Sequence, residues 1–594
     1  MNFSEKDFKL VENTILDGKK FNDNQKEFIQ LLGSKYIIAG PGVGKTTCLV
    51  AKIVLLLMGI TSENSKEAIC IITQTNVAVD EINRILRMLG LSHINHPHFI
   101  GTVHQFFNTF LAIPYIKKHL NPQNLRFADE EDYSTLISVL VHKSSYFGKW
   151  SEGAKTSVIK RIKESNLIYD LKTNKINLEN SSAWDKFDKH QLHMFNIKWE
   201  LKRLGFFTFN DTFLFAEAAL GYEKNISILR KRFKYVFIDE FQDTKASNIK
   251  ILKKIFLSEG NIIQFVGDPN QTLDFYGQMP EVDYNNVFEL KVCNRFGEKI
   301  ARQLPNIING VNLECLKENE SFDPLLIIYN ANKELIPFYK KIFLEFLALE
   351  GFLKSDRKDS ILSLRKKAIN EYNSSSDQEV SEYKISRSES FTNHIIKLIN
   401  ELILKKMSLV GEFNFDLKQW IKDHPEQLGI KKCLIESVKA GKLEKETLKV
   451  KINTILKEEN SGVINSSNEI FNKIVSVIKL IKNSYEATEV IKNENGNFLY
   501  STIHAAKGET HRSVLLIDSD ESEIIHTRML KSFYCKDDIS YADEWVARNL
   551  LYVAMSRPTH LFAFGINNKN ISKEEIQIFK DKGWDIRYTF DVTE

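Results

Sequence analysis

A glycine-rich segment, residues 36–47, has the residue types and spacing that phosphate binding requires. It reads YIIAGPGVGKTT, an apolar strand followed by a glycine-rich loop and by Gly44-Lys45-Thr46 at the start of a helical pattern. In such a loop, backbone N–H groups surround the phosphates, the lysine reaches the β- and γ-phosphates, and the hydroxyl binds Mg²⁺. Ala39 replaces the usual first glycine. The alternative is a chance glycine-rich turn, which the flanking strand and helix disfavour.

Two adjacent carboxylates follow a second apolar run, in YVFIDEFQDT at residues 235–244. Asp239 is placed to hold Mg²⁺ through water, together with Thr46, and Glu240 to orient or deprotonate an attacking water. Acids at this position also cap helices, which is the structural alternative. The presence of Lys45 upstream favours the catalytic interpretation.

Phosphoryl transfer also needs cations beside the γ-phosphate, and arginine supplies them best. Two candidates lie far downstream, Arg295 in LKVCNRFGEKIA and Arg557 in ARNLLYVAMSRPTH. Taken alone, an arginine of this kind is most often a surface salt-bridge residue. A separate loop, FVGDPNQTLDFYG at residues 265–277, places an amide and two aromatic rings directly after an apolar strand.

The composition limits the class of protein. At 594 residues the chain is too long for one hydrophobic core, so two or more domains are expected. Lys plus Arg number 81 against 77 Asp plus Glu, which by itself does not indicate a nucleic-acid partner. The six cysteines form no CxxC pair, so we expect a reducing, cytoplasmic location. The N-terminus lacks the apolar region of a signal peptide, and the apolar run 53–58 is too short to cross a membrane.

Strand-like apolar runs alternate with helical patterns along much of the chain, which is typical of parallel βα units. These runs are residues 36–39, 69–73, 235–238, 262–266, 325–329 and 514–517. They predict an α/β fold with two doubly wound parallel sheets. Residues 112–204 and 355–495 have helical periodicity instead, including an amphipathic stripe at 391–402. We expect these two stretches to be mainly helical insertions.

Nine segments in order resemble the motifs of the UvrD/Rep-type superfamily 1 DNA helicases, and they span nearly the whole chain. The segments are FNDNQKEFI (21–29), AGPGVGKTT (39–47), TQTNVAVDEI (73–82), GTVHQFF (101–107), DEFQDT (239–244), VGDPNQTLDFYG (266–277), CNRFGEKIA (293–301), STIHAAKGETH (501–511) and NLLYVAMSRP (549–558). The resemblance implies two RecA-like P-loop domains, each with parallel sheets, helices on both faces and a mainly helical insertion. It places the first domain at 1–111 and 205–285, the second at 286–354 and 496–594, and the insertions at 112–204 and 355–495.

The resemblance also implies ATP and Mg²⁺ as cofactors, bound between the two domains. Lys45 and Glu240 would then lie on one domain and Arg295 and Arg557 on the other, so that hydrolysis requires closure. The implied catalytic residues are Lys45, Asp239, Glu240, Gln271, Arg295 and Arg557. The implied nucleotide-binding residues are Gln25, Gly40, Pro41, Gly42, Val43, Gly44, Lys45, Thr46 and Thr47.

Single-stranded and duplex DNA are the partners that the resemblance implies. Hydroxyls, amides and rings at the matching positions would contact the phosphate-sugar track without reading sequence, or stack on bases. These positions are Thr75, Asn76, Thr102, His104, Phe275, Tyr276, Thr502 and His504. Individually, each small polar residue is as well suited to capping a helix or making a turn. Trp150 is a further stacking candidate, although packing into the core of the first insertion is the preferred interpretation.

The sequence departs from the family pattern at the base-binding positions. Thr47 and Asn294 replace the usual arginine and tyrosine that sandwich the base, which leaves Gln25 to select adenine and Phe296 as a substitute ring. In the fifth motif, Glu509 precedes Thr510 where the family has Leu-Glu. The Lys-Gly-Glu-Thr-His and Ser-Arg-Pro-Thr-His strings are similar to the GajB-like helicases of Gabija antiviral defence systems.

The leading hypothesis is therefore an ATP-dependent 3′–5′ DNA translocase or helicase that is stimulated by single-stranded DNA. It could work with a partner nuclease of the OLD/TOPRIM type in antiviral defence. The alternatives are a regulatory DNA-sensing ATPase subunit that licenses such a nuclease, and a housekeeping DNA-repair helicase.

Overall fold

The computed structural model describes most of the chain as two compact units, which are residues 1–373 with 498–594, and residues 374–497. The described residues are 3–365 except 17, 63–65, 75, 89–95, 129, 171, 180–187, 274–279, 317, 350–351, 353–354 and 356, then 372, 399, 426–427, 429–430, 432–433, 445–458, 498–517 and 542–591. Both large sheets belong to the first unit.

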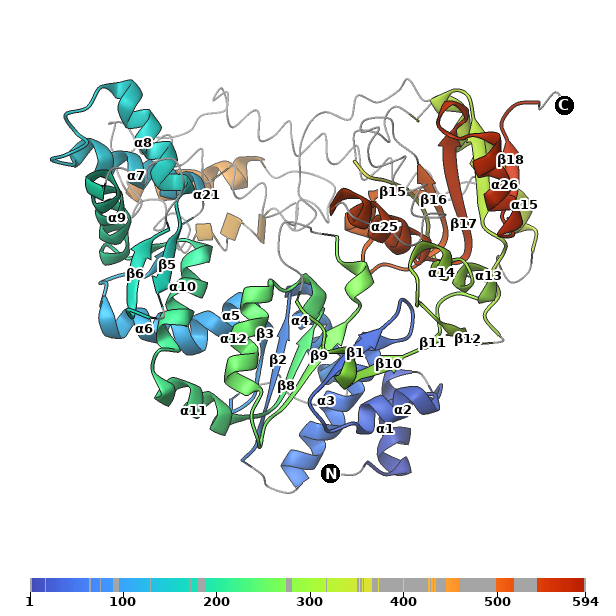
Figure 1. The fold of residues 1–594 in the computed structure, drawn as a ribbon, viewed down its shortest axis with the longest axis horizontal. Helices are drawn as coiled ribbons and strands as arrows, with labels where there is room; N and C mark the ends of the chain where they lie inside the picture. The colour runs from blue at the N-terminus through green and yellow to red at the C-terminus, as the bar shows by residue number, and fades with distance from the viewer. Residues whose placement is uncertain are drawn as a thin grey trace. The chain divides into compact units, whose positions relative to one another are not determined.

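The first sheet has six parallel strands in the order β10-β1-β9-β8-β2-β3 (Figure 1). Its strands are β1 Lys35–Ala39, β2 Ala68–Thr73, β3 Phe99–Thr102, β8 Phe233–Asp239, β9 Ile262–Gly267 and β10 Val287–Leu290. The four strands predicted in this half are confirmed. Because β10 pairs with β1, the first sheet continues past residue 285, where the first domain was expected to end.

Helices cover both faces of the first sheet. Successive side chains of a strand point to opposite faces, and apolar side chains on both faces must be buried. On β2, Ile69 and Ile71 pack in a core with α1 Glu5–Ile15, α2 Asp23–Gln30 and α3 Lys45–Ser62. Cys70 and Ile72 face the opposite core. That second core is built by α5 Val103–Phe107, α10 Phe209–Ala219, α11 Glu223–Arg232 and α12 Ala246–Phe256. The sheet is thus buried on both sides.

The second sheet is also six-stranded and parallel, in the order β15-β14-β16-β17-β13-β18. Its strands are β13 Leu325–Tyr329, β14 Asp359–Ser363, β15 Phe498–Thr502, β16 His511–Ile517, β17 Pro558–Asn567 and β18 Asp585–Tyr588. The predicted strands 325–329 and 514–517 are confirmed. Strand β14 lies between β15 and β16, although the sequence pattern predicted a helical insertion from residue 355.

Two cores also flank the second sheet. Leu326 and Ile328 of β13 pack with α25 Ala542–Met555 and α26 Lys573–Asp581, whereas Leu325 and Ile327 pack with α15 Asn332–Leu347. Short elements between the two sheets complete this domain, namely β11 Val292–Cys293, β12 Glu314–Cys315, α13 Glu298–Ala301 and α14 Leu304–Ile307. The predicted fold class, a pair of parallel α/β domains with helices on both faces, is confirmed.

The first insertion, at residues 112–204, is mainly helical. It contains α6 Ile113–His119, α7 Glu130–Lys143, α8 Glu152–Glu164 and α9 Asp188–Arg203, together with the hairpin β5 Leu167–Asp170 and β6 Lys175–Leu178. Trp150 is half-buried, with its ring centroid 5.1 Å from that of Phe147 and 5.3 Å from that of His190. Trp150 therefore packs against the insertion core, as its preferred interpretation expected.

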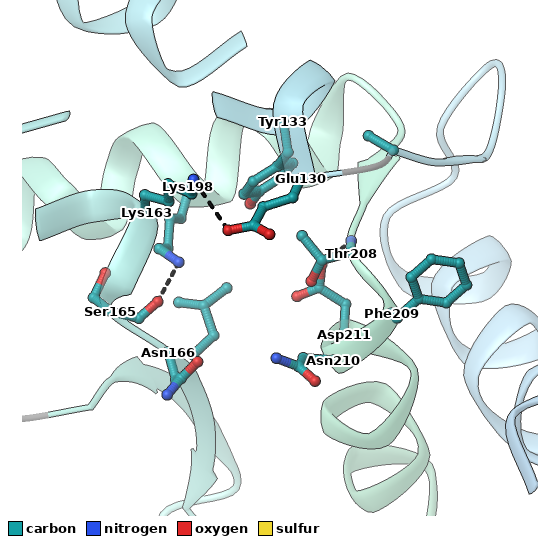
Figure 2. Close-up of a pocket in the computed structure, with 12 residues that line it drawn as sticks. Glu130, Tyr133, Lys163, Ser165, Asn166, Lys198, Thr208, Phe209, Asn210 and Asp211 are labelled. Atoms are coloured by element: carbon teal, nitrogen blue, oxygen red, sulfur yellow. Dashed lines mark hydrogen bonds and ion pairs between the residues drawn. The ribbon is translucent and has the colours of Figure 1, made fainter. Parts of the chain in front are cut away.

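A cavity of about 310 Å³ opens beside this insertion (Figure 2). Lys198 lines it and donates to the Ser165 carbonyl, and the lining residue Asp211 forms an ion pair with the buried Lys202. The Lys202 Nζ atom lies 2.5 Å from Asp211 Oδ2 and 2.8 Å from the Tyr133 hydroxyl. Removing one partner of such a pair would leave an uncompensated buried charge, so the cluster fixes α9 against α10.

The second unit contributes one longer described helix, α21 Lys445–Glu458, which buries Leu448, Ile452, Ile455 and Leu456. The amphipathic stripe predicted at 391–402 lies outside the described residues apart from Ile399, which is buried. Among the residues that the structure describes, no helix is long and apolar enough to cross a membrane.

Candidate nucleotide-binding site and nucleic-acid interface

The predicted phosphate-binding loop leaves β1 at Ala39 and enters α3 at Lys45, so the expected strand and helix flank it. Gly42 and Gly44 have φ angles of +77° and +78°, a left-handed conformation that favours glycine. A Cβ atom on Gly42 would lie 2.5 Å from the Cβ of Arg295, which comes from the second domain. Glycine at this position therefore permits the backbone of the second domain to approach the loop.

Gln25 lies against the same loop. It occupies the first turn of α2, where its side chain accepts from the Asn22 N–H at 3.1 Å and donates through Nε2 to the Val43 carbonyl at 2.9 Å. The Asn22 side chain accepts in turn from the Gln25 N–H, which completes a capping box. Gln25 is buried, and its amide links α2 directly to this loop.

Lys45 lies between two carboxylates at the end of β8. Its Nζ atom is 3.7 Å from Asp239 Oδ1 and forms an ion pair with Glu240. Burial opposes the charge on Lys45, but Glu240 and Asp239 raise its pKa above the usual value. Burial raises the pKa of Asp239, whereas that of Glu240 is lowered by Lys45 despite burial. Glu240 also has φ +50°, an unusual backbone conformation of the kind that clusters at functional sites.

These residues fit a divalent cation bound with the nucleotide. Asp239 is almost fully buried and faces Lys45 across 3.7 Å, and Thr46 lies in the first turn of α3. Lys45 compensates the charge of the buried Asp239 carboxylate. If a nucleotide phosphate drew Lys45 away, a divalent cation would be needed to compensate that charge instead.

Gln242 links the acidic pair to β9, and the sequence motifs alone did not single it out. Its Nε2 group donates to Glu240, and its Oε1 atom accepts from the Asp268 N–H at 3.2 Å. A Cβ atom on Gly267 would lie 2.0 Å from Gln242 Oε1, so Gly267 permits this approach. Gln242 thereby connects the ends of two neighbouring strands.

Gln271 connects this edge of the first domain to the second. Its Nε2 group donates to Asp268 Oδ2 at 2.9 Å, and its Oε1 atom accepts from Arg557 Nη2 at 3.3 Å. Tyr552, on α25, donates its hydroxyl to the same Asp268 oxygen at 3.2 Å. Burial raises the pKa of Asp268, which these donors oppose.

Arg557 is buried and Arg295 is partly buried, so neither is a surface salt-bridge residue. Arg295 Nη1 donates to the Ser556 carbonyl at 2.8 Å, and Arg557 Nε donates to the Val553 carbonyl at 2.9 Å. Burial lowers the pKa of Arg295 to about 10 and that of Arg557 to about 9, with Arg295 adding to the effect on Arg557. Neither forms an ion pair with a carboxylate among the described residues, so an anion between the domains would compensate both charges.

Three further contacts join the two domains. Lys507 Nζ lies 2.7 Å from Asp243 Oδ2, the Asn549 side chain donates to the Thr272 carbonyl at 2.9 Å, and the Asn294 N–H donates to the Gly42 carbonyl at 2.8 Å. Lys507, Asn549 and Tyr552 were not predicted as site residues. They do fall inside the quoted motifs STIHAAKGETH and NLLYVAMSRP, which was the available signal.

The predicted DNA-contacting residues occupy equivalent places in the two domains. Thr102 ends β3 and caps α5, and Thr502 ends β15 and caps α23 Ile503–Ala506. Both strands are edge strands, and a histidine follows each threonine by two residues, His104 and His504. The capping role proposed as the alternative for the threonines is therefore present.

The remaining predicted DNA residues are described only in part. Thr75, Phe275 and Tyr276 lie outside the described residues, and Asn76 begins α4 Asn76–Met88. The hypothesis that Phe296 supplies a base-stacking ring is wrong, because Phe296 is fully buried in the core of the second domain. Glu509 is half-exposed, its carboxylate lies 3.3 Å from His511 Nε2, and its carbonyl accepts from Arg557.

Two parallel α/β sheets with helices on both faces, the first with a glycine-rich loop after β1, define the fold as a pair of RecA-like domains. Residues 21–276 match the family model of the UvrD/REP helicase N-terminal domain. The family match therefore covers five of the six strands of the first sheet, all but β10, together with the first insertion.

Relatives extend the similarity into the second domain. The chain is 23% identical to the ATP-dependent DNA helicase Rep of Buchnera aphidicola subsp. Baizongia pistaciae, over 86% of this chain and 87% of the relative. It is 28% identical to DNA helicase II of Haemophilus influenzae, over 54% of this chain and 45% of the relative. It is also 28% identical to the ATP-dependent DNA helicase srs2 of Schizosaccharomyces pombe, over 43% of this chain and 30% of the relative. The chain thus spans less than half of the last two proteins.

Proposed function

We propose that this protein is an ATP-dependent DNA translocase and helicase that moves 3′ to 5′ and is stimulated by single-stranded DNA. The observation that carries the proposal is a chain of hydrogen bonds between the domains. It runs from Glu240, the ion-pair partner of Lys45, through Gln242, Asp268 and Gln271 to Arg557 of the second domain. The names of the relatives, Rep and DNA helicase II, supply the activity class and DNA as the substrate.

The nucleotide would bind between the domains, with its phosphates on the loop that precedes α3. Lys45 would exchange its ion pair with Glu240 for the phosphates, which frees the Glu240 carboxylate to orient the attacking water. Mg²⁺, held by Thr46 and Asp239, would neutralise phosphate charge when bound. Arg295 and Arg557 would stabilise the charge that develops on the γ-phosphate, which their lack of carboxylate partners within the described chain favours.

DNA would lie along the edges where β3 and β15 end. The two Thr-x-His segments, at residues 102–104 and 502–504, present a hydroxyl and an imidazole at equivalent positions of the two domains. Such groups contact phosphates without reading sequence. Because one segment belongs to each domain, closing the domains on ATP would change the spacing of two contacts on one strand, as translocation requires.

Strand separation on tailed duplexes tests this proposal. The protein, ATP and Mg²⁺ are mixed with a duplex that carries a single-stranded 3′ tail, a 5′ tail or no tail. We expect separation of the 3′-tailed duplex only, and none with Lys45→Ala or Glu240→Gln. Separation that is equal for the 5′-tailed duplex, or that persists in Lys45→Ala, would contradict the proposal.

A partner nuclease of the OLD/TOPRIM type and a role in antiviral defence stay predictions from two short sequence strings. Affinity purification of the full chain from its native cells, followed by mass spectrometry, tests them. Recovery of a stoichiometric nuclease would favour a licensing subunit over a housekeeping repair helicase. Recovery of the chain without a nuclease would remove the basis for that interpretation.

A further inference from the structure

Two cysteines that are distant in sequence lie side by side next to the phosphate-binding loop. Cys293 ends β11 and Cys315 ends β12, and the two residues are direct partners in the register of these parallel strands. Neighbouring strands are about 4.8 Å apart, and in-register side chains project from the same face. This separation lies within the range of about 4.4 to 6.8 Å between Cα atoms that a disulfide spans.

The two thiols are chemically unequal. A hydrogen bond with Cys315 lowers the pKa of Cys293 despite its burial, and the same contact and burial raise the pKa of Cys315. Cys293 also accepts from the Arg295 N–H at 3.4 Å. Cys293 is fully buried, whereas Cys315 is partly exposed, so Cys315 is the member of the pair with surface accessible to a small solute. A thiolate beside a second thiol is the arrangement of a peroxide-sensitive dithiol.

The position of Cys293 gives its oxidation a consequence. A Cβ atom on Gly42 would lie 2.8 Å from the Cys293 sulfur, which places that sulfur against the phosphate-binding loop. The next residue, Asn294, donates its N–H to the Gly42 carbonyl, and Arg295 donates its N–H to the Cys293 sulfur. One short segment therefore positions both the loop and a candidate catalytic arginine.

We propose that Cys293 and Cys315 form a reversible redox site, in which a disulfide between them slows ATP hydrolysis; the effect on activity rests on the proposed function. The Cys315 sulfur, which is the accessible one of the two, attacks hydrogen peroxide, the O–O bond breaks, and Cys315 becomes a sulfenic acid as hydroxide leaves. The Cys293 thiolate then attacks the Cys315 sulfur, the S–O bond breaks, and a second hydroxide leaves. Protons from the two thiols convert both hydroxides to water. The thiols lose two electrons in total, which the peroxide gains.

Disulfide formation would turn the Cys293 sulfur toward β12 and away from the Arg295 N–H. Misplacing a catalytic group by about 1 Å can cost about a hundredfold in rate, so we expect the rate of ATP hydrolysis to fall by about tenfold or more. A thiol reductant should restore it, because the exchange reaction is reversible.

The test treats the reduced full-length chain with hydrogen peroxide and measures two quantities. Peptide mass spectrometry detects the Cys293–Cys315 linkage, and a steady-state assay measures ATP hydrolysis before and after reduction. The matched variants are Cys315→Ser, which removes the partly exposed partner, and Cys70→Ser, which removes a buried cysteine of the first sheet. We expect inhibition in the wild type and Cys70→Ser, and little in Cys315→Ser.

The outcomes separate this inference from the proposed function. If the reduced wild type hydrolyses ATP but no Cys293–Cys315 linkage forms, or if the linkage forms without slowing hydrolysis, the redox site is overturned. Inhibition that is equally strong in Cys315→Ser would overturn it as well. A reduced wild type without ATP hydrolysis would instead contradict the proposed function, while the mass measurement would still report on the disulfide.

Discussion

Lys507 and Asp243 form an ion pair that joins the two α/β domains, with 2.7 Å between Nζ and Oδ2. Asp243 follows the acidic pair at the end of β8, and Lys507 follows the Thr-x-His segment of the second domain. The pair therefore connects the candidate ATP site to the candidate DNA site directly, through one ion pair.

Replacing Lys507 should affect activity more than stability. The pair is about a quarter exposed, and such pairs contribute about 1 kcal/mol or less to stability. We expect Lys507→Ala to reduce the stimulation of ATP hydrolysis by single-stranded DNA while the melting temperature shifts little. Lys507→Arg, which keeps the charge, should retain most of the stimulation. A large fall in melting temperature with unchanged stimulation would show that the pair is only structural.

Replacing Tyr552 should lower both the stability of the protein and its rate of ATP hydrolysis, because Tyr552 contacts Asp268. Tyr552→Phe removes the buried hydroxyl that donates to Asp268 Oδ2, at a cost of about 1–3 kcal/mol in the free energy of unfolding. We also expect slower ATP hydrolysis, because Asp268 positions Gln271. Tyr339→Phe is the matched control, since its buried hydroxyl donates to Ser513 away from the site. Urea unfolding and steady-state hydrolysis measure both effects, and equal loss of activity in the control would contradict the assignment.

The strands were predictable because each is an apolar run buried on both faces, which leaves a clear mark in the sequence. Strand β14 was missed because three of its five residues, DSILS, are polar. The segment is therefore not an apolar run in the sequence, although all five residues are buried in the fold. The role of Phe296 was predicted wrongly because the sequence alone does not distinguish a phenylalanine ring that faces the nucleotide from one that packs in the core. The pairs Lys507–Asp243 and Cys293–Cys315 depend on long-range packing, which residue spacing does not contain.

Lys52 should give the unfolding free energy a measurable pH dependence. It lies on α3, fully buried, and donates to the Phe28 and Leu31 carbonyls at the end of α2. Burial lowers its pKa to about 7, whereas an unfolded lysine titrates near about 10.4. Between these values the unfolded chain binds more protons, so the contribution of Lys52 to the free energy of unfolding rises with pH, by at most about 1.4 kcal/mol per pH unit.

Urea unfolding of the wild type and Lys52→Met at pH 7, 8 and 9 measures this contribution. We expect the wild type to gain stability relative to Lys52→Met as the pH rises. The control is Lys6→Met, at an exposed position of α1, for which the difference from wild type should stay constant. A constant difference for Lys52→Met as well would contradict the assigned burial effect.

The rate of ATP hydrolysis by the isolated full-length chain, with and without single-stranded DNA, tests the central claim most directly. The claim is that Lys45 and Glu240 of the first domain and Arg557 of the second act on one ATP molecule under the control of DNA. We predict strong stimulation of the wild type by single-stranded DNA. We also predict a loss of about 10³-fold or more in the stimulated rate for Arg557→Ala, with ATP binding retained. A rate that single-stranded DNA leaves unchanged, or an Arg557→Ala variant as active as the wild type, would contradict the account.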